Sequence, residues 1–329
     1  MSRRPTLKDV ARVAGVSQMT ASRALRGAGD VSVQTLKAVE NAARELGYVP
    51  NRIAGALASK RVNLVGVIFP SLSSFVFPEV LSGLSAGLKD TPLQPVVGLS
   101  AYDAETEERV IRDMLSWRPS GLVVAGLEHN DAARRLLENA EVPVVEIMDV
   151  DGTPVDHCVG ISHLKAGRMM AREILARGYR KIGFIGTKMP QDYRAAKRRA
   201  GFAETLAQAG VSLQDEELYA GGSTLGKGRE LTARLLQRSP EIDCIYYSSD
   251  VMSVGGLMHC LATGLRVPDD LALAGFNGLE LLEGLPIRLA TTDAHRFEIG
   301  RQAAELVLAG KGAPRVIELE PTVTAAASL

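Results

Sequence analysis

The sequence predicts an α/β protein in which a small all-α head precedes a larger core of two doubly wound parallel-sheet subdomains. Residues 6–27 carry two short helical patterns separated by a glycine. From residue 64 onward, short apolar runs alternate with amphipathic helical patterns, which is typical of parallel sheets covered by helices on both faces. The chain has 329 residues, which is more than one ordinary domain and suits two or three.

The first 27 residues are interpreted as two helices joined by a tight turn. Thr6 is a candidate helix cap, and Asp9 stands three residues on, at the spacing of a capping box. Gly15 is placed where a left-handed residue ends a helix, and Ser17 can cap the next one. This is helix-turn-helix spacing, in which the start of the second helix faces base edges in the DNA major groove. An ordinary helical hairpin inside a core is the alternative.

A third helix and a segment of small residues follow. Ser32 can cap a helix that runs to Leu46 with apolar residues at helical spacing, and Gly47 ends it. The segment from Tyr48 to Ala58 is short and weakly helical. Because isolated helices of this length are marginal in water, we expect it to become ordered only against a partner.

Charge is unevenly distributed along the chain. Ten Lys and Arg residues against four acidic residues give residues 1–60 a net charge of +6, and the remainder carries −6. A basic head on an acidic body fits a nucleic-acid-binding module joined to another domain. No apolar run predicts a membrane span, the N-terminus lacks the apolar region of a signal peptide, and three cysteines without metal spacing favour a reducing compartment. The cytoplasm is the default expectation.

The head resembles that of the lactose-repressor (LacI/GalR) family of bacterial transcription regulators. The resemblance rests on T-L-x-D-V-A-x-x-A-G-V-S-x-x-T-x-S-R from Thr6 to Arg23, V-S at Val31 and Ser32, and L-G-Y-x-P-N-R-x-A-x-x-L from Leu46 to Leu57. It implies a periplasmic-binding-protein-like core, a homodimer, and double-stranded operator DNA and a small-molecule effector as partners. No cofactor and no membrane partner are implied.

The resemblance covers essentially the whole chain and implies its division. Residues 1–50 form the helix-turn-helix domain, 51–63 the hinge helix and linker, and 64–329 the effector-binding and dimerisation core. The N-subdomain takes about 64–161 and 293–320, and the C-subdomain about 162–292 and 321–329.

The expected strands are Leu64–Phe69, Pro95–Gly98, Gly121–Ala125, Val142–Glu146, His157–Ile161, Lys181–Ile185, Cys244–Tyr247 and Leu271–Ala274. The expected helices are Pro78–Lys89, Glu105–Trp117, Ala132–Asn139, Leu164–Arg177, Tyr193–Gln208, Leu225–Gln237, Met252–Thr263 and Phe297–Leu308.

Ten residues of the head and hinge are candidate DNA contacts. Gln18 can read adenine, Met19 can touch thymine methyl groups, and Arg23 can reach guanine or phosphate. By resemblance, the hinge helix places Leu57 as an apolar wedge in the minor groove. The ten candidates are Thr6, Ser17, Gln18, Met19, Thr20, Ser22, Arg23, Asn51, Ala54 and Leu57; Thr20 and Ser22 are expected to hold phosphates.

The effector is expected at the carboxyl ends of the core strands, where small and polar residues gather. By resemblance, Arg198 matches the family's effector-gripping arginine, and Ser249 and Asn277 match two further contact positions. The family often has Asn-Asp where this chain has Ser249-Asp250, and Asp where it has Asn277. Because the pocket would then contain fewer carboxylates, an anionic ligand is favoured. Lys188 and Lys197 either contact this ligand or are simply solvated. The candidates are Ser71, Phe75, Tyr102, Glu146, Lys165, Arg198, Ser249 and Asn277.

Several stretches are most similar to the gluconate-utilisation repressor branch of the family. These are Val65–Leu72, Phe77–Leu81, Met114–Trp117 and Pro143–Asp149. We therefore expect a repressor whose effector is gluconate or a related sugar acid, with induction favoured for a catabolic regulator. No leucine heptads follow residue 318, so we expect a dimer without the tetramer-forming tail of some members.

The sequence also bears on the class of protein. It contains no G-x-x-x-x-G-K-[ST], no G-x-G-x-x-G after a strand, no H-E-x-x-H and no C-x-x-C, and its five histidines are scattered. We therefore expect no catalytic residues, no metal ligands and no enzyme activity. A sugar-binding receptor without a DNA function would explain the core but not the basic head. A metabolic enzyme with a DNA-binding head would need a nucleophile or cofactor motif that the sequence lacks.

Overall fold

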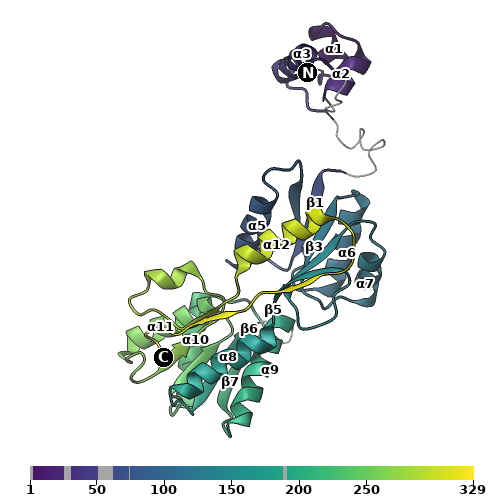
Figure 1. Cartoon of the computed structure of the whole chain (residues 1–329). Coiled ribbons are helices and arrows are strands. Elements are labelled where there is room, and N and C mark those ends of the chain that lie inside the picture. The colour runs from purple at the N-terminus through teal and green to yellow at the C-terminus, as the bar shows by residue number, and fades with distance from the viewer. Residues whose placement is uncertain (1–2, 26–30, 51–61, 74, 188–190) are drawn as a thin grey trace. The chain divides into compact units, whose positions relative to one another are not determined.

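The computed structural model describes residues 3–25, 31–50, 62–73, 75–187 and 191–329 (Figure 1). The chain divides into two compact units, a head of Met1–Val62 and a core of Asn63–Leu329. The described part of the head contains three helices: α1 (Leu7–Val13), α2 (Gln18–Leu25) and α3 (Val33–Leu46).

The helix ends of the head follow the predicted capping residues. The Asp9 carboxylate accepts hydrogen bonds from the backbone N–H and the hydroxyl of Thr6, at 2.9 and 2.6 Å, and so fixes the start of α1. Gly15 adopts φ +66° after α1, and the Ser17 hydroxyl accepts a bond of 3.0 Å from the Thr20 N–H at the start of α2. The predicted helix-turn-helix geometry is therefore present.

Small side chains hold the three head helices together. Their shared core consists of Val10, Ala11, Ala21, Ala24, Val39, Ala42 and Ala43. Ser32 caps α3 through the Thr35 N–H, and Gly47 ends it at φ +62°. Because alanines line most of the contact, the helices pack closely and leave the opposite face of α2 exposed to solvent.

The first half of the core is a parallel sheet covered on both faces by helices. Its strand order is β11-β5-β4-β3-β1-β2, with every pair parallel. The strands are β1 (Leu64–Phe69), β2 (Gln94–Leu99), β3 (Gly121–Ala125), β4 (Val144–Asp149), β5 (His157–Ile161) and β11 (Val316–Glu318). Helices α5 (Val76–Gly87) and α12 (Arg296–Ala309) pack on one face, and α6 (Ala104–Ser116) and α7 (Asp131–Glu138) on the other.

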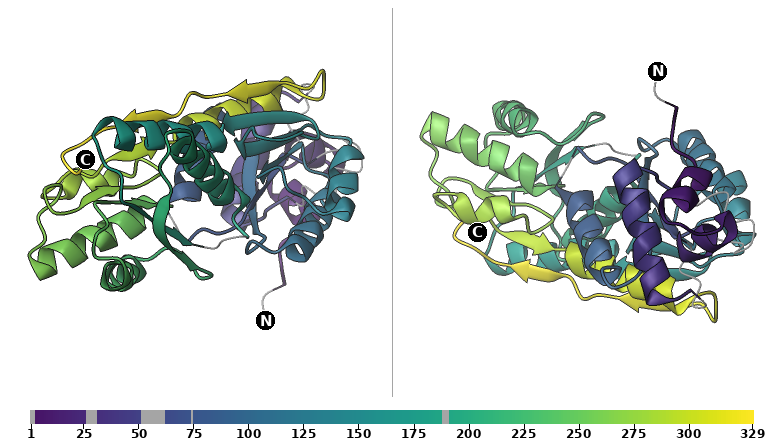
Figure 2. Two further views of the ribbon diagram at one scale, coloured as in Figure 1. Left: turned by 90° about the horizontal axis from the view of Figure 1, so that it is seen from below. Right: turned by 90° about the horizontal axis from the view of Figure 1, so that it is seen from above.

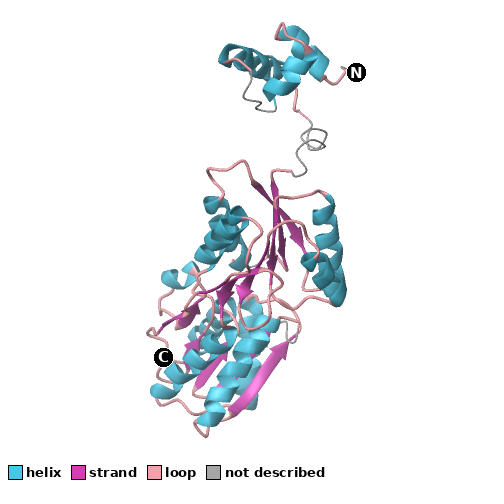
Figure 3. Cartoon of the chain, turned by 45° about the vertical axis from the view of Figure 1, so that its right-hand side comes forward, coloured by secondary structure: helices cyan, strands magenta, loops and turns pink. Residues whose placement is uncertain are grey.

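The second half repeats this architecture with a smaller parallel sheet (Figure 3). The strand order is β7-β6-β8-β9, formed by β6 (Ile182–Thr187), β7 (Leu213–Tyr219), β8 (Cys244–Tyr247) and β9 (Ala272–Ala274). Helices α8 (His163–Ala176) and α9 (Tyr193–Gln208) cover one face. Helices α10 (Leu225–Arg238) and α11 (Asp250–Thr263) cover the other, and a 3₁₀ turn follows at Glu280–Gly284.

The chain passes between the two halves three times. It leaves the first sheet after β5, returns through β10 (Thr291–Asp293) into α12, and leaves again after β11. β10 pairs antiparallel with β12 (Thr322–Thr324) as a separate ribbon, and the C-terminal segment runs along both halves of the core (Figure 2). Among the described residues, no helix is both long enough and apolar enough to cross a membrane.

The predicted α/β class is confirmed, and each of the sixteen expected core elements is present within a few residues of its predicted ends. Four further strands of the described chain were not predicted: β7, β10, β11 and β12. β7 reads Leu-Gln-Asp-Glu-Glu-Leu-Tyr and lies at a sheet edge. Acidic side chains are tolerated at such an edge, so the strand lacks the apolar run that marks its neighbours.

Glycines let the backbones of α8 and α9 touch. A Cβ built at Gly167 on α8 would lie 2.0 Å from the carbonyl oxygen of Arg198, and one at Gly201 on α9 would lie 2.2 Å from that of Leu164. No side chain fits either position. This contact fixes the position of α9 against α8 and therefore the position of Arg198, which lines the pocket described below.

We expect Gly167→Ala to destabilise the core by about 2 kcal/mol, because the helices must separate to admit the methyl group. The thermal unfolding midpoint should fall by about 5 °C. Gly226→Ala is the matched control, since Gly226 lies in α10 and a Cβ there has nothing within 4 Å; its midpoint should be equal or higher. Equal midpoints for the two variants would contradict the close packing of α8 on α9.

Candidate functional sites

The exposed face of α2 is the first candidate site. Ala21 and Ala24 point into the head core, whereas Gln18, Met19 and Arg23 lie on the solvent side, and 72% of the Met19 surface is exposed. An amide, a thioether and a guanidinium on the exposed side of a helix can hydrogen-bond and touch base edges. A long apolar side chain left so exposed is more easily explained by a contact surface than by folding.

The other predicted DNA contacts are distributed around this face. The hydroxyls of Ser17 and Thr20 lie 2.8 Å apart at the start of α2, where backbone N–H groups and the helix dipole favour a phosphate. Thr6 caps α1, and Ser22 is partly buried. Asn51, Ala54 and Leu57 lie outside the described residues.

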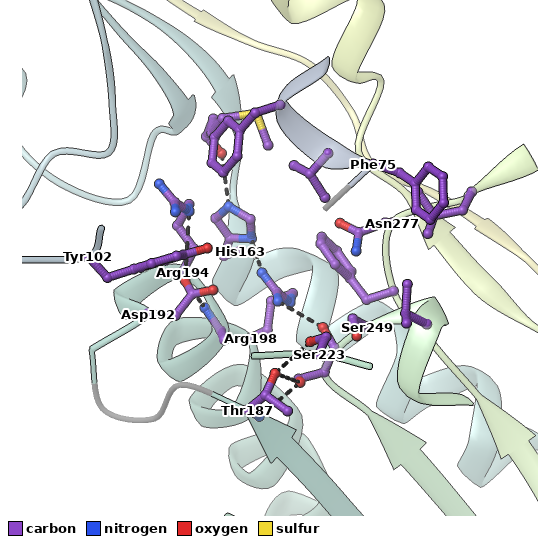
Figure 4. A pocket seen from close by; sticks show the side chains of 18 of the residues that line it. Phe75, Tyr102, His163, Thr187, Asp192, Arg194, Arg198, Ser223, Ser249 and Asn277 are labelled. Atoms are coloured by element: carbon purple, nitrogen blue, oxygen red, sulfur yellow. Dashed lines mark hydrogen bonds and ion pairs between the residues drawn. The ribbon is translucent and has the colours of Figure 1, made fainter. Parts of the chain in front are cut away.

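The second candidate site is a pocket of about 150 Å³ in the core, at the carboxyl ends of strands from both sheets (Figure 4). Five of the eight predicted effector residues line it: Phe75, Tyr102, Arg198, Ser249 and Asn277. The other lining residues are Ser73, Val76, Phe77, Met148, His163, Thr187, Asp192, Arg194, Ala195, Ser223, Ser248, Val251, Phe276 and Leu279.

Arg198 is a buried cation whose side chain is held in one orientation. Its guanidinium lies 3.7 Å from the centre of the Phe276 ring, donates to Nδ1 of His163 at 3.0 Å, and donates to the Ser248 carbonyl at 3.1 Å. Only 6% of the residue is exposed, and burial lowers its pKa. None of the carboxylates that the structure describes forms an ion pair with it.

His163 is neutral in this arrangement. Burial lowers its pKa well below the ordinary value, and the nearby Arg198 charge adds to that effect. Nε2 of the ring lies 2.8 Å from the Met148 carbonyl, so it carries the proton, and Nδ1 accepts from Arg198. The histidine therefore orients Arg198 without compensating its charge.

Unpaired polar atoms surround the guanidinium. Nε of Arg198 and Oγ of Ser249 are buried and have no hydrogen-bond partner among the described residues. Asn277 presents its side chain to the pocket from a backbone with φ +128°, which a non-glycine residue rarely adopts (Figure 4). Buried groups of this kind are normally satisfied, so they point to a bound partner with several oxygen atoms.

A second arginine stands on the same face of α9. Arg194 lies one helical turn before Arg198, is 9% exposed, and forms a long contact of 3.7 Å with Asp192. Phe77 stacks near its guanidinium at 5.7 Å, and the side chain of Tyr102 lies beside it. Asp192 is the one carboxylate among the described lining residues and also caps α9 through the Ala195 N–H. The pocket is therefore richer in positive than in negative charge.

The structure places three predicted effector residues outside this pocket. The Glu146 side chain does not reach the pocket and points toward His129, whose Nε2 lies 3.3 Å from its Oε1. Lys165 is exposed and pairs with Glu320 and Glu318, and Ser71 bonds to Ser73 in the loop after β1. Lys197 is also occupied, since Nζ lies 2.5 Å from both Glu128 and Asp149, and Lys188 lies outside the described residues.

Several lining residues were not among the predicted effector contacts. His163 and Phe276 look like ordinary residues at element ends, Thr187 is the last residue of β6, and Ser223 is a hydroxyl in a loop. Arg194 had a signal that was missed, because it lies four residues before Arg198 and therefore on the same helix face. Among the described residues, no group of three His, Cys, Asp or Glu side chains is placed to hold a metal ion.

A buried charge cluster lies behind the pocket. His129 is sandwiched between Glu107 at 2.6 Å and Glu146 at 3.3 Å. Burial opposes the charged ring, but the two carboxylates outweigh it and raise the pKa of His129 to about 9. The imidazolium thus ties α6 to the ends of β3 and β4.

Comparison with known proteins yields matches over both units. Residues 6–51 match the bacterial regulatory proteins of the lacI family, and residues 63–322 match the periplasmic binding proteins and sugar binding domain of the LacI family. The HTH-type transcriptional regulator GntR of Pseudomonas aeruginosa is 40% identical over 93% of this chain and 89% of its own length. GntR of Escherichia coli (strain K12) is 33% identical over 99% of each. A crystal structure of a LacI-family transcriptional regulator from Silicibacter pomeroyi matches with 57% identity and a TM-score of 0.94, over 98% of this chain and 99% of that one.

The His129 cluster predicts a specific pH dependence of stability. Because the folded pKa lies above the unfolded value of 6.5, the contribution is complete below pH 6.5 and is lost as the pH rises through about 9. We expect His129→Gln to remove on the order of 2 kcal/mol at pH 6 and much less at pH 9.5. Urea unfolding at both values measures this. His259→Gln is the control, since burial lowers rather than raises the pKa of His259; a difference that persists at pH 9.5 would contradict the charged cluster.

Proposed function

The chain belongs to the LacI family of bacterial transcription regulators, and from that premise we propose that it is a repressor whose effector is gluconate or a closely related sugar acid. Members of the family bind DNA under the control of a small molecule and are not enzymes. Family membership also implies dimerisation and operator DNA. Such a repressor would act on the chromosome, in the cytoplasm.

The observation that carries the effector proposal is the uncompensated charge of Arg198. Burying a guanidinium without an anion is costly, and the cost falls when a carboxylate binds to it. A ligand carboxylate would accept hydrogen bonds from Arg198 in the two-point geometry that arginine offers. A neutral sugar carries no charge that would offset the desolvation of Arg198.

The other polar groups of the pocket suit the hydroxyls of an aldonate. Ser249 and Asn277 line the pocket beside Arg198, and Thr187 and Ser223 offer further hydroxyls from the second half of the core. Phe75 and Tyr102 supply the apolar contact that sugar carbons need. Relatives named GntR agree with the resemblance to gluconate-utilisation repressors.

On the DNA side, we assign base reading to the exposed face of α2. Gln18 would contact adenine, Met19 a thymine methyl group, and Arg23 guanine or phosphate. Ser17, Thr20, Ser22 and Thr6 would hold phosphates, and the segment with Asn51, Ala54 and Leu57 would enter the minor groove. One such helix reads only a few base pairs, so a homodimer on a two-fold site is needed.

Effector binding would control this interaction through the two halves of the core. A ligand gripped by Arg198 from one half and by Phe75 and Tyr102 from the other changes how the halves are held. The coupling would alter operator affinity by about 1–3 kcal/mol, and induction is the expected direction.

We expect calorimetric titration to show saturable gluconate binding that Arg198→Ala weakens at least about 100-fold, because the truncation removes the anion's charged partner. Neutral sugars such as glucose should bind far more weakly or not at all. Circular dichroism and thermal unfolding show whether the variant is folded, and Arg198→Lys, which keeps the charge but loses the fork, should give an intermediate affinity.

The matched control is Arg199→Ala. Arg199 is the next residue on α9, pairs with Glu216 through two bonds of 2.8 Å, and does not line the pocket. Its gluconate affinity should stay within about twofold of the parent. Undiminished gluconate binding by Arg198→Ala, or binding of neutral sugars alone, would refute the sugar-acid proposal and leave the DNA-binding regulator intact.

We expect Gln18→Ala to cost about 1–3 kcal/mol of operator affinity and to relax base preference at one position of each half-site. The operator is first selected from a pool of two-fold symmetric duplexes, and binding is then measured by fluorescence anisotropy at fixed salt. Asn41→Ala, an exposed amide on α3, is the control and should leave affinity unchanged. A uniform loss across all sequences would assign Gln18 to phosphate rather than base contact.

A further inference from the structure

A second cavity of about 260 Å³ adjoins the effector pocket. The two cavities share Tyr102 and Arg194, so the same two side chains border both. The second cavity is otherwise lined by residues from the strand ends of the first sheet and from the starts of α6, α7 and α9. These are Pro70, Ser100, Asp103, Ala104, Glu107, Ala125, Gly126, Glu128, His129, Asn130, Gln191 and Tyr193.

The wall of the second cavity contains carboxylates that already pair with a cation. One oxygen of Glu107 pairs with His129, and one oxygen of Glu128 pairs with Lys197 at 2.5 Å. Oε2 of Glu128 also lies 3.4 Å from the Leu127 N–H. Carboxylate oxygens accept hydrogen bonds, so hydroxyl donors of a ligand are matched to this wall.

Tyr193 gives this cavity a flat apolar surface. It is the first residue of α9, 54% of its surface is exposed, and it lines the second cavity but not the effector pocket. An aromatic ring beside acceptor oxygens suits a molecule with an apolar face and a rim of hydroxyls. A pyranose ring has that shape, and an open-chain polyol does not.

The different chemistry of the two cavities indicates how one ligand would lie across them. Arg198 and the unpaired Ser249 hydroxyl demand an anion and its hydroxyl groups at one end. Acceptors and an aromatic face at the other end demand a neutral sugar ring. Gly126 supports this continuity, because a Cβ at that position would lie 3.3 Å from Nη1 of Arg194 and narrow the boundary between the cavities.

We propose that the effector pocket and the second cavity together form a binding site for a glycosylated aldonate (an aldobionate), with the aldonate carboxylate at Arg198 and a neutral pyranose against Tyr193. This rests on the proposed sugar-acid function and extends it, since the preferred ligand is then longer than gluconate. Glu107 and Glu128 accept hydroxyls of the pyranose, and Tyr102 and Arg194 flank the linkage between the two units.

Calorimetric titration of the full-length protein with gluconate, lactobionate, maltobionate and cellobionate tests the proposal. At least one aldobionate should bind about tenfold more tightly than gluconate, which is the effect of one well-placed contact. Tyr193→Ala should abolish that advantage and leave gluconate affinity within twofold, whereas Tyr193→Phe should keep it. Leu225→Ala, which removes an exposed side chain at the first position of α10 and lines neither cavity, is the matched control.

The outcomes separate this proposal from the function on which it rests. Gluconate binding with equal or weaker aldobionate binding overturns the second site and leaves the sugar-acid function standing. An aldobionate advantage that survives in Tyr193→Ala overturns the placement of the pyranose. Failure of all four acids to bind overturns both proposals together.

Discussion

The arrangement of the effector pocket depends on the burial of one guanidinium without a carboxylate partner. Arg198 is held by an aromatic face, a neutral imidazole and a carbonyl, which fix its direction but leave its charge uncompensated. Such a group destabilises the core, because these contacts offset the desolvation of the cation only in part. In our proposal the same deficit favours an anionic ligand, whose carboxylate would offset the desolvation of Arg198.

Helix α9 carries this chemistry across the boundary between the two halves of the core. Arg194, Lys197 and Arg198 lie three and four residues apart, so they share one helix face. Lys197 already pairs with Glu128 and Asp149 of the first half, and Arg198 reaches Met148 of that half through His163. Gly167 and Gly201 allow α9 to pack with its backbone directly against α8. A ligand bound by Arg198 would therefore contact a helix that already pairs with the opposite half. Ligand binding would in this way be coupled to the relative position of the two halves.

Much of the fold was predictable, whereas the site was predictable only in part. Periodicity located the apolar strands and helices, and the long head motif identified the family, both of which are confirmed. Strand β7 was not predicted, because acidic side chains are tolerated at a sheet edge and the strand therefore lacks an apolar pattern. In the site, strand-end reasoning brought in Glu146, although successive side chains of a strand face opposite sides and Glu146 points toward His129. His163 and Phe276 carry no sequence signal, since only the folded chain brings them against Arg198.

The polarity of the two cavities has a consequence for selectivity that neither cavity would have alone. The pocket at Arg198 is donor-rich, and its one described carboxylate, Asp192, is already used to cap α9 and to contact Arg194. The adjoining cavity is acceptor-rich, and its carboxylates Glu107 and Glu128 pair with His129 and Lys197. A ligand with an acidic end and a neutral end can satisfy both only in one direction, since reversal would leave the Arg198 cation unpaired and set a carboxylate beside Glu107 and Glu128. Discrimination then comes from the cost of the wrong orientation as much as from the contacts of the right one.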